Sequence, residues 1–488
     1  MATAHTTHQT DPMTQTETIA YDVVVLGGGP SGENVADRTR AAGLTTAVVE
    51  SELLGGECSY WACMPSKALL RPIIARADAR RLPGLAQAVQ GPLGTQAVLA
   101  RRDEYAARWK DDGQVSWLTG TGADLHRGHG RLVGPRTVTV TAPGGTVTTL
   151  TARHAVAVCT GTRARLPDLP GLAGVAPWTS REATSAKAAP GRLIVVGGGV
   201  VATEMATVWR ALGSHVTVLV RGKGLLNRME PFAGELVADA LTGAGVDLRT
   251  GTFVESVTRD NGTVAVVTSA GDRIEADEIL FATGRVPRTD DLGLDTVGLE
   301  PGSWLDVDDS LRVSGTDWLY AVGDVNHRAL LTHQGKYQAR IAGAAIAARA
   351  AGTPLLDGPW GSHAATADHD AVPQVVFTDP EAAAVGLSLA EAERAGHRVR
   401  AVDVEFSSVA GAGLYADGYR GRARMVVDLE DEILRGVTFV GPGVGELIHS
   451  ATVAVAGRVP VSRLWHAVPS YPTLSEVWLR LLEALRDN

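Results

Sequence analysis

The sequence predicts an α/β protein with three domains. Two glycine-rich turns carry this prediction, because each follows a short apolar, β-branched run and precedes a helical stretch, first within residues 21–42 and again within residues 193–212. The third observation is that residues from 372 onward alternate strands and short helices without such a turn. A chain of 488 residues is long enough for roughly three domains. We therefore expect two Rossmann-like units and a separate C-terminal α+β domain.

Composition and charge narrow the possible functions. The net charge of −9 argues against a nucleic-acid partner, and no uninterrupted apolar run is long enough to cross a membrane. Three cysteines in so long a chain are no disulfide scaffold, so we expect a cytoplasmic protein whose cysteine pair does redox or metal work. Residues 1–20, rich in Thr, His and Gln, are expected to form a disordered tail rather than a signal peptide.

The first glycine-rich turn has the form of a dinucleotide-binding fingerprint. The apolar run 21–26 leads into Gly27, Gly29 and Gly32, then a helical stretch, then a second strand that ends in Glu50. Gly27 allows the tight turn, Gly29 lets the backbone approach a pyrophosphate, and Gly32 lets helix pack on strand. The helix N-terminus would supply free N–H groups to the phosphates, and Glu50 would accept hydrogen bonds from ribose hydroxyls.

Two of the three cysteines lie five residues apart in the stretch from Leu54 to Lys67. On an ideal helix that spacing separates Cα atoms by roughly 8 to 9 Å, whereas a disulfide needs about 4.4 to 6.8 Å. A bridge between Cys58 and Cys63 therefore needs a distorted helical turn, which Gly55 and Gly56 permit. Two unrelated buried thiols are the alternative, and a zinc site is a weaker one, because zinc wants four ligands.

Between the two turns the sequence predicts several further elements. We expect a helix at 103–117, a β-meander at 132–152, and a buried strand that runs from Val156 through Cys159 into a tight turn at Gly161. Cys159 is accordingly expected to be a core residue.

The second glycine-rich turn, with Gly197, Gly199 and Ala202, repeats the fingerprint but differs at the end of its second strand. That strand ends in Arg221 rather than in an acid, and two further basic residues follow closely. An acid would bind the 2′-hydroxyl of NAD, whereas arginine gives a 2′-phosphate a charge-assisted partner. We therefore predict NADPH rather than NADH, with a solvated basic turn as the alternative. Two nucleotide folds in one chain suggest a flavin paired with a pyridine nucleotide.

With these motifs the chain resembles the pyridine nucleotide-disulfide oxidoreductases, the FAD enzymes that include dihydrolipoamide dehydrogenase, glutathione reductase and mercuric reductase. The most specific match is Gly-Gly-Glu-Cys58 through Cys63-Met-Pro-Ser-Lys67, supported by Ala282-Thr-Gly-Arg285, Gly323-Asp324 and Gly-Glu446-Leu-Ile-His. The resemblance implies an FAD-binding domain at 21–160 and 288–360, an NAD(P)H-binding domain at 161–287, and a dimerisation domain at 368–488.

The resemblance also implies residue roles. Cys63 would face the flavin, and Cys58 would exchange with the substrate. Lys67 and Glu204 would form an ion pair beside the flavin. The implied catalytic residues are Cys58, Cys63, Tyr471, Glu476, Lys67 and Glu204. The implied FAD-binding residues are Gly27, Gly29, Gly32, Glu50, Gly56, Lys67, Gly122, Ala123, Thr160, Gly161, Asp324 and Thr332. The implied NADPH-binding residues are Gly197, Gly199, Ala202, Glu204, Arg221 and Gly284.

The chain departs from the family pattern near its C-terminus. The family normally has a catalytic His in a His-Pro-Thr-x-x-Glu motif that reaches the partner subunit's thiols, and here the motif reads Tyr471-Pro-Thr-Leu-Ser-Glu476. A phenol, with a pKa near 10, is a poor base at neutral pH, although it can still donate a hydrogen bond. His466 lies nearby but lacks the motif's spacing.

Tyr471 also resembles the tyrosine of mercuric reductases. Those enzymes carry a C-terminal cysteine pair that this chain lacks, which argues against mercuric-ion reduction. A second departure is the aromatic pair Tyr60 and Trp61 between the cysteines, which suggests a more apolar acceptor site.

We therefore expect an FAD-containing homodimer that passes electrons from NADPH through Cys58 and Cys63 to a small-molecule acceptor, a disulfide other than lipoamide or glutathione. Three alternatives remain open. The enzyme could reduce a quinone or metal ion directly from the flavin with non-essential cysteines, it could resemble dihydrolipoamide dehydrogenase in its substrate, or the protein could keep FAD for stability without catalysis.

Overall fold

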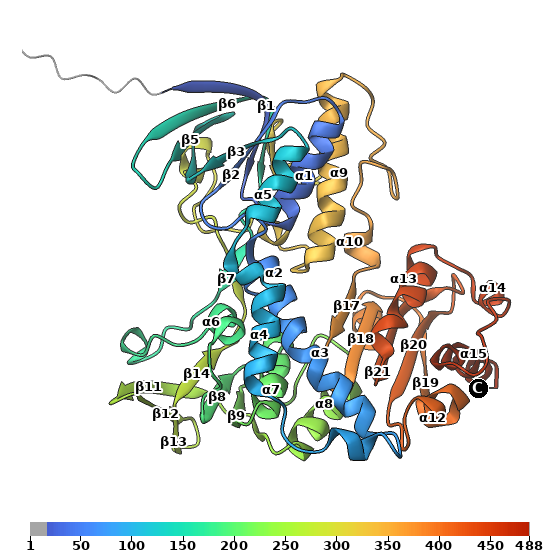
Figure 1. Cartoon of the computed structure of the whole chain (residues 1–488). Coiled ribbons are helices and arrows are strands. Elements are labelled where there is room, and N and C mark those ends of the chain that lie inside the picture. Colours follow the sequence, from blue (N-terminus) through green and yellow to red (C-terminus); the bar gives the residue numbers. More distant parts are fainter. Residues whose placement is uncertain (1–16, 488) are drawn as a thin grey trace, which may run out of the picture.

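The computed structural model describes residues 17–487 (Figure 1). Most of the expected N-terminal tail lies outside these residues. Residues 18–20, which were expected to belong to that tail, instead begin strand β1 (Thr18–Leu26). The first residues of β1 pair with the first half of the long strand β6 (Val147–Val158), with Thr18 opposite Thr149.

A seven-stranded sheet forms the first α/β unit (Figure 1). Strands β3, β2, β1 and β6 are parallel neighbours, and the meander β4–β5–β6 continues the sheet antiparallel. Val23, Val24 and Val25 are fully buried, as expected for a parallel strand covered on both faces. The other strands of this sheet are β2 (Thr46–Glu50), β3 (Asp124–Arg127), β4 (His129–Gly134), β5 (Thr137–Thr141) and β16 (Leu319–Ala321).

Helices α1 (Pro30–Ala41) and α9 (Thr332–Ala350) lie side by side against this sheet (Figure 1). β16 pairs with β6 in parallel, so the chain returns to the first sheet after the second unit. The antiparallel pair β7 (Thr162–Ala164) and β15 (Arg285–Pro287) joins the outgoing and returning chain.

The second unit is a four-stranded parallel sheet in the order β10-β9-β8-β14. A three-stranded antiparallel sheet, β11-β12-β13, accompanies it. The elements are β8 (Arg192–Val196), α7 (Val200–Ala211), β9 (His215–Val220), α8 (Pro231–Gly243), β10 (Asp247–Thr250), β11 (Val254–Asp260), β12 (Thr263–Thr268), β13 (Arg273–Ala276) and β14 (Glu278–Phe281).

Five helices connect or flank these units: α2 (Gly56–Tyr60), α3 (Cys63–Arg80), α4 (Thr95–Tyr105), α5 (Asp112–Gly120) and α6 (Ser180–Ser185). The prediction of a single helix at 103–117 is wrong, because α4 and α5 share this stretch. Ala107, Arg108 and Trp109 have φ angles of 49°, 51° and 53°, which end α4 and separate it from α5. Trp109 is held in this turn by a 3.1 Å hydrogen bond from Nε1 to the carbonyl of Tyr60.

The C-terminal part is an α+β unit whose five-stranded antiparallel sheet has the order β17-β18-β21-β20-β19. Its core includes the buried rings of Phe406 and Phe439. The elements are α10 (Ala367–Asp370), β17 (Pro373–Val376), β18 (Glu381–Gly386), α11 (Leu389–Arg394), β19 (Val399–Glu405), α12 (Ala410–Tyr415), β20 (Arg422–Asp428), β21 (Leu434–Gly441), α13 (Ile448–Ala456), α14 (Val461–Leu464) and α15 (Val477–Asp487).

These three units confirm the predicted α/β class, with two units built on parallel strands and one α+β unit. Within residues 17–487, no helix combines the length and the apolar character that a membrane crossing requires.

Candidate active site

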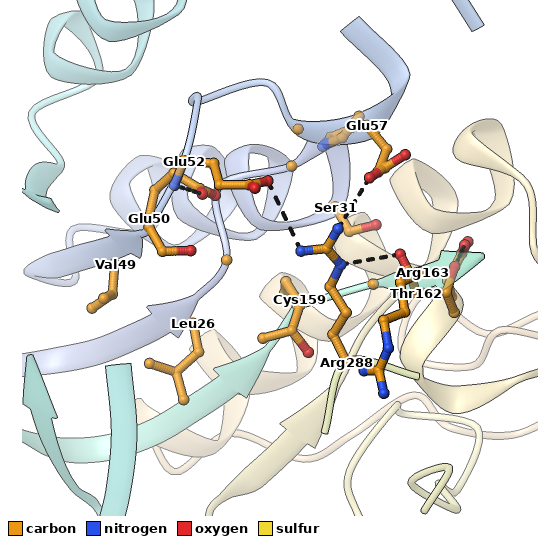
Figure 2. A pocket seen from close by; sticks show the side chains of 18 of the residues that line it. Leu26, Ser31, Val49, Glu50, Glu52, Glu57, Cys159, Thr162, Arg163 and Arg288 are labelled. Carbon is orange, nitrogen blue, oxygen red and sulfur yellow. Dashed lines mark hydrogen bonds and ion pairs between the residues drawn. The ribbon is translucent and has the colours of Figure 1, made fainter. Parts of the chain in front are cut away.

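A cavity of about 350 Å³ opens at the carboxyl ends of β1, β2 and β6 (Figure 2). This is the edge at which parallel α/β sheets bind ligands. Eight of the residues expected to bind FAD line it: Gly27, Gly29, Glu50, Gly56, Thr160, Gly161, Asp324 and Thr332.

The glycines of the first turn are required by close backbone approaches. Gly27 has a φ of +100°, and a Cβ atom there would lie 2.5 Å from the carbonyl oxygen of Cys159. A Cβ atom on Gly32 would lie 1.9 Å from the carbonyl oxygen of Gly27, so helix α1 can pack on β1 only through glycine. Gly29 is the N-cap of α1, and Gly29, Pro30 and Ser31 line the cavity, so the N-terminus of this helix lies at it.

Glu50 ends β2 and projects toward the cavity (Figure 2). Its Oε2 accepts a 2.7 Å hydrogen bond from the Gly28 N–H, and its Oε1 accepts a 2.6 Å bond from the Glu52 N–H. Burial raises the pKa of this carboxyl group. Each oxygen retains a lone pair for a hydroxyl donor, which fits the expected ribose contact.

Asp324 follows β16, the strand that pairs with β6, and lines the same cavity as Glu50. Its Oδ2 accepts a 2.7 Å hydrogen bond from the Thr162 hydroxyl, and burial raises the pKa of the carboxyl group. These features fit FAD: a helix N-terminus and a glycine cradle for the pyrophosphate, and acids at separate positions for hydroxyl groups.

Gly122 and Ala123, which were expected to bind FAD, do not line the cavity. A Cβ atom on Gly122 would lie 2.7 Å from a guanidinium nitrogen of Arg40, so this glycine faces Arg40. Ala123 is buried in the core. The cavity is lined instead by Gly128, which lies between β3 and β4, and by His129 and Gly130, the first residues of β4. Both segments are short and glycine-containing, and the sequence offers no local signal that separates them.

The two cysteines of the redox motif flank a break in the helix. Cys58 lies in α2 and Cys63 begins α3, while Trp61 and Ala62 between them have φ angles of −136° and −131°. The expected distortion of the helical turn is therefore present. Both cysteines are free thiols in this structure.

The surroundings of the thiols favour a proton on one and a charge on the other. The hydrogen bond with Cys58, then the Thr332 hydroxyl, then the charge of Lys67 hold the pKa of Cys63 below its usual range. The same hydrogen bond with Cys63, together with burial, raises the pKa of Cys58. These surroundings favour the thiolate form on Cys63 and the thiol form on Cys58.

Lys67 and Glu204 meet as expected, although they come from α3 and α7. The Lys67 Nζ lies 3.0 and 2.8 Å from the two carboxylate oxygens of Glu204. Glu204 is only 3% exposed and accepts a further 3.0 Å bond from the N–H of Phe377, whose ring lies beneath the ammonium. Three chain segments therefore meet next to the Cys63 helix.

The second glycine turn has the same strain as the first. Gly197 has a φ of +133°, and a Cβ atom there would lie 2.4 Å from the carbonyl oxygen of Ala282. Gly199 precedes α7, Ala202 is buried, and Gly284 follows β14 with a φ of +118°. Arg221 is exposed directly after β9, where the ribose of a bound nucleotide is expected.

Tyr471 and Glu476 differ in exposure. Tyr471 is 76% exposed on the C-terminal unit, and it does not line the cavity that holds Cys58. Glu476 is buried, and its Oε2 accepts a 3.3 Å hydrogen bond from the Gly411 N–H. His466 is exposed. A role for Tyr471 at the thiols therefore requires a second subunit.

The aromatic pair between the cysteines does not form an open acceptor site. Tyr60 is 2% exposed, and its hydroxyl donates a 2.9 Å hydrogen bond to the carbonyl of Leu54. The Trp61 ring lies under the guanidinium of Arg181, 4.1 Å from its centroid to Cζ. Both rings pack against the protein and fix the cysteine segment.

Sequence reasoning missed a group of charged residues that line the same cavity: Glu52, Glu57, Arg181, Arg285 and Arg288. They come from three separate parts of the chain and form ion pairs with one another (Figure 2 shows Arg288 between Glu52 and Glu57). No spacing in the sequence relates them. Among residues 17–487, no group of His, Cys, Asp or Glu could hold a metal ion.

A glycine-cradled nucleotide cavity lined by Cys58, a second cysteine in the adjoining helix and a second dinucleotide turn define a nucleotide-dependent oxidoreductase. The model of the pyridine nucleotide-disulphide oxidoreductase family matches residues 21–351, and that of the family's dimerisation domain matches residues 372–481. The chain belongs to the pyridine nucleotide-disulphide oxidoreductase family. It is accordingly an FAD-dependent, NAD(P)H-dependent flavoprotein oxidoreductase.

Relatives with different activities match over nearly the whole chain. A dihydrolipoyl dehydrogenase of Thermus scotoductus is 32% identical, with 96% of this chain and 98% of the relative covered. A glutathione reductase of Burkholderia cepacia is 30% identical over 94% of this chain and 98% of the relative. A mercuric reductase of Acidithiobacillus ferrooxidans is 31% identical over 93% of this chain and 80% of the relative.

Solved structures share the fold. LpdA from Mycobacterium tuberculosis superimposes with a TM-score of 0.81 at 27% identity, covering 96% of this chain and 99% of LpdA. The HOCl-induced flavoprotein disulfide reductase RclA from Escherichia coli, in its Cu(II) complex, superimposes with a TM-score of 0.81 at 22% identity, covering 95% and 99% of the two chains.

Proposed function

We propose that the protein is an NADPH-dependent disulfide reductase that passes an electron pair through Cys58 and Cys63 to a small disulfide acceptor other than lipoamide or glutathione. The observation that carries this proposal is the arrangement of the two thiols. Cys58 lines the cavity, and Cys63 lies 3.3 Å from Thr332, which also lines it. When bound there, FAD would supply the carrier between a pyridine nucleotide and the thiols.

The residues support a balanced reaction. The Cys58–Cys63 disulfide takes up two electrons and one proton, which leaves a thiol on Cys58 and a thiolate on Cys63. Loss of the Cys58 proton lets its sulfur attack the acceptor disulfide, releasing one acceptor thiol, and attack by Cys63 on the mixed disulfide releases the second. The net change is NADPH, a proton and a disulfide to NADP⁺ and two thiols.

The ion pair of Lys67 and Glu204 would hold a positive charge next to α3. The Lys67 ammonium favours the Cys63 thiolate, and the ion pair with the buried Glu204 holds the lysine side chain in position. We propose that this pair stands beside the reacting part of FAD, that Asp324 binds its ribityl chain, and that Glu50 binds its ribose.

We also propose NADPH as the donor and a homodimer as the working form. Arg221 offers an exposed guanidinium to a 2′-phosphate. The match to the dimerisation domain supports association, as do large apolar side chains left exposed on the C-terminal unit: Leu414, Val453, Val468 and Tyr471. On this proposal, 21–160 with 288–360 binds FAD, 161–287 binds NADPH, and 368–488 forms the interface.

Anaerobic titration with NADPH, followed by the absorption spectrum, tests the proposal. We expect two electron equivalents to give a long-wavelength thiolate-to-flavin band while the flavin absorption persists, and a Cys63→Ser variant to lose that band. Bleaching of the flavin by the first two electrons would contradict the proposal. Such bleaching would support a second candidate function, the direct reduction of a quinone or metal ion by the flavin. The presence of Tyr471 where the family has a catalytic base favours this candidate.

A further inference from the structure

Two glutamates and two arginines form a ring of ion pairs around the turn that precedes Cys58. Arg181 from α6 donates to Glu57 at 2.5 Å and to Glu52 at 2.7 and 3.1 Å. Arg288, which follows β15, lies 3.1 Å from Glu57 and 3.9 Å from Glu52 (Figure 2). Each glutamate therefore faces both arginines, and Arg285 adds a further positive charge 3.9 Å from Glu57.

The ring surrounds a segment that contains two adjacent glycines. Glu52 and Glu57 bracket Leu53, Leu54, Gly55 and Gly56, and the two glycines have φ angles of +107° and +58°. Glycine backbones lose the most conformational freedom on ordering, so the contacts that hold this turn matter. Besides the ring, the Leu54 N–H donates to Asp111 and the Gly55 N–H donates to the Gly28 carbonyl, both at 2.7 Å. Glu57 is the second residue of α2 and lies directly before Cys58.

The arginine on α6 is itself firmly held. Thr179 and Glu182 form a capping box at the N-terminus of α6, and Thr184 near its C-terminus donates a 2.8 Å hydrogen bond to the carbonyl of Trp61. The fully buried Arg102 donates to the carbonyls of Thr184 and Ala186. α6 is thus fixed from both ends.

Arg181 also contacts the segment on the other side of Cys58. Its guanidinium stacks over the Trp61 ring at 4.1 Å, while its N–H groups hold Glu57. One side chain therefore bridges the residue before Cys58 and the residue two before Cys63. Arginine can stack and pair at once, because its guanidinium is planar, and lysine cannot reproduce both contacts.

We propose that Glu52, Glu57, Arg181 and Arg288 are positioning residues that hold Cys58 within bonding reach of Cys63, and so set the stability of the disulfide between them. This inference rests on the proposed function, in which these cysteines form a redox disulfide. The ring lines the cofactor cavity as well, so the test must separate thiol positioning from cofactor binding.

The test measures the disulfide directly in the FAD-saturated full-length protein. Wild type and Arg181→Met are equilibrated in glutathione redox buffers, free thiols are trapped by alkylation, and the fraction of Cys58–Cys63 disulfide is quantified by mass spectrometry. The equilibrium is disulfide plus two reduced glutathione to dithiol plus oxidised glutathione, so no other reductant enters.

We expect Arg181→Met to shift this equilibrium toward the dithiol by about tenfold, the effect of losing one charge-assisted hydrogen bond. Arg181→Lys should recover part of the shift, and Arg288→Met should cause a smaller one, because its contacts are longer. Arg192→Met is the matched control. It removes an arginine of β8 that forms an exposed ion pair with Asp277, and it should leave the equilibrium unchanged.

Three results would decide against the inference or its premise. An unchanged equilibrium in Arg181→Met would overturn the positioning role, and so would a variant that loses FAD affinity while its thiol equilibrium stays at the wild-type value. If Arg181→Met does not fold, Glu57→Gln, which keeps side-chain volume, replaces it with the same expected direction. Failure of wild type to form the disulfide in the most oxidising buffer would overturn the proposed function instead.

Discussion

The Sγ atom of Cys63 lies 3.3 Å from the Oγ1 atom of Thr332, the first residue of α9. These residues are 269 positions apart in the chain, and the return of the chain to the first sheet brings them together. The contact places the thiolate of the pair at the N-terminus of a 19-residue helix, where the helix dipole favours negative charge.

Replacing Thr332 by valine should raise the pKa of Cys63, because the hydroxyl stabilises the thiolate. The lowered pKa means that the thiolate is present above that pKa and lost as the pH falls through it. We expect Thr332→Val to move the pH midpoint of thiolate formation upward by about one unit. Absorption of the two-electron-reduced protein as a function of pH measures it.

Thr119→Val is the control, since its hydroxyl donates only to carbonyls within α5. A midpoint in Thr332→Val equal to that of wild type would show that the hydroxyl does not stabilise the thiolate.

Local patterns predicted the fold well, because a glycine turn between strand and helix is a property of neighbouring residues. Gly27, Gly32 and Gly197 occupy conformations or contacts that tolerate no side chain, as their fingerprint positions implied. The interpretation failed where tertiary contacts decide. Trp109 lies in the turn that separates α4 from α5, and its hydrogen bond to the Tyr60 carbonyl holds that turn. Helix propensity alone does not predict such a contact.

The charged ring could not be predicted for the same reason. Arg181 is 124 positions from Glu57, and Arg288 is 231 positions from it, so no spacing links them. The residue pair Lys67 and Glu204 was found only because the family resemblance supplied it.

Replacing Tyr471 by histidine should raise activity toward simple disulfides. Imidazole titrates near neutral pH and can take the thiol proton that phenol cannot, an effect worth about 100-fold in rate. Tyr471 is 76% exposed in the single chain, so the substitution should leave the subunit fold intact. The measurement is kcat/KM for small symmetrical disulfides at pH 7.

Tyr471→Phe separates loss of the hydroxyl from gain of a base. Equal activity of Tyr471→His and wild type toward every simple disulfide would mean that the pocket excludes them, and that the missing base is not what limits the reaction.

Replacing Arg221 by serine should reduce the preference for NADPH. The guanidinium can form a charge-assisted pair with the 2′-phosphate, and its loss should raise the KM for NADPH about tenfold while the KM for NADH stays the same. Initial rates with both nucleotides measure the ratio. Arg273→Ser removes an exposed arginine of the same unit, paired with Glu275, and should change neither KM. Equal losses with both nucleotides would argue against 2′-phosphate recognition.

Glu33 gives a pH-dependent prediction for stability. This residue of α1 is 6% exposed, and none of residues 17–487 hydrogen-bonds its Oε1 atom. Burial raises the pKa of Glu33 to about 7; the charge of Lys336 on α9 opposes the shift, and the charge of Glu50 adds to it. Because the folded-state pKa lies above the unfolded one, stability is full below about pH 4.5 and falls as the pH rises through 7.

Replacing Glu33 by glutamine should therefore stabilise the protein at pH 8 by on the order of 3 kcal/mol and have little effect at pH 4.5, since the amide cannot ionise. Thermal unfolding of the FAD-saturated protein at both pH values measures the difference. Glu235→Gln, at an exposed position of α8, should leave Tm unchanged at either pH. A Glu33→Gln variant whose gain in Tm is the same at pH 4.5 and pH 8 would show that packing, and not the buried charge, causes the effect.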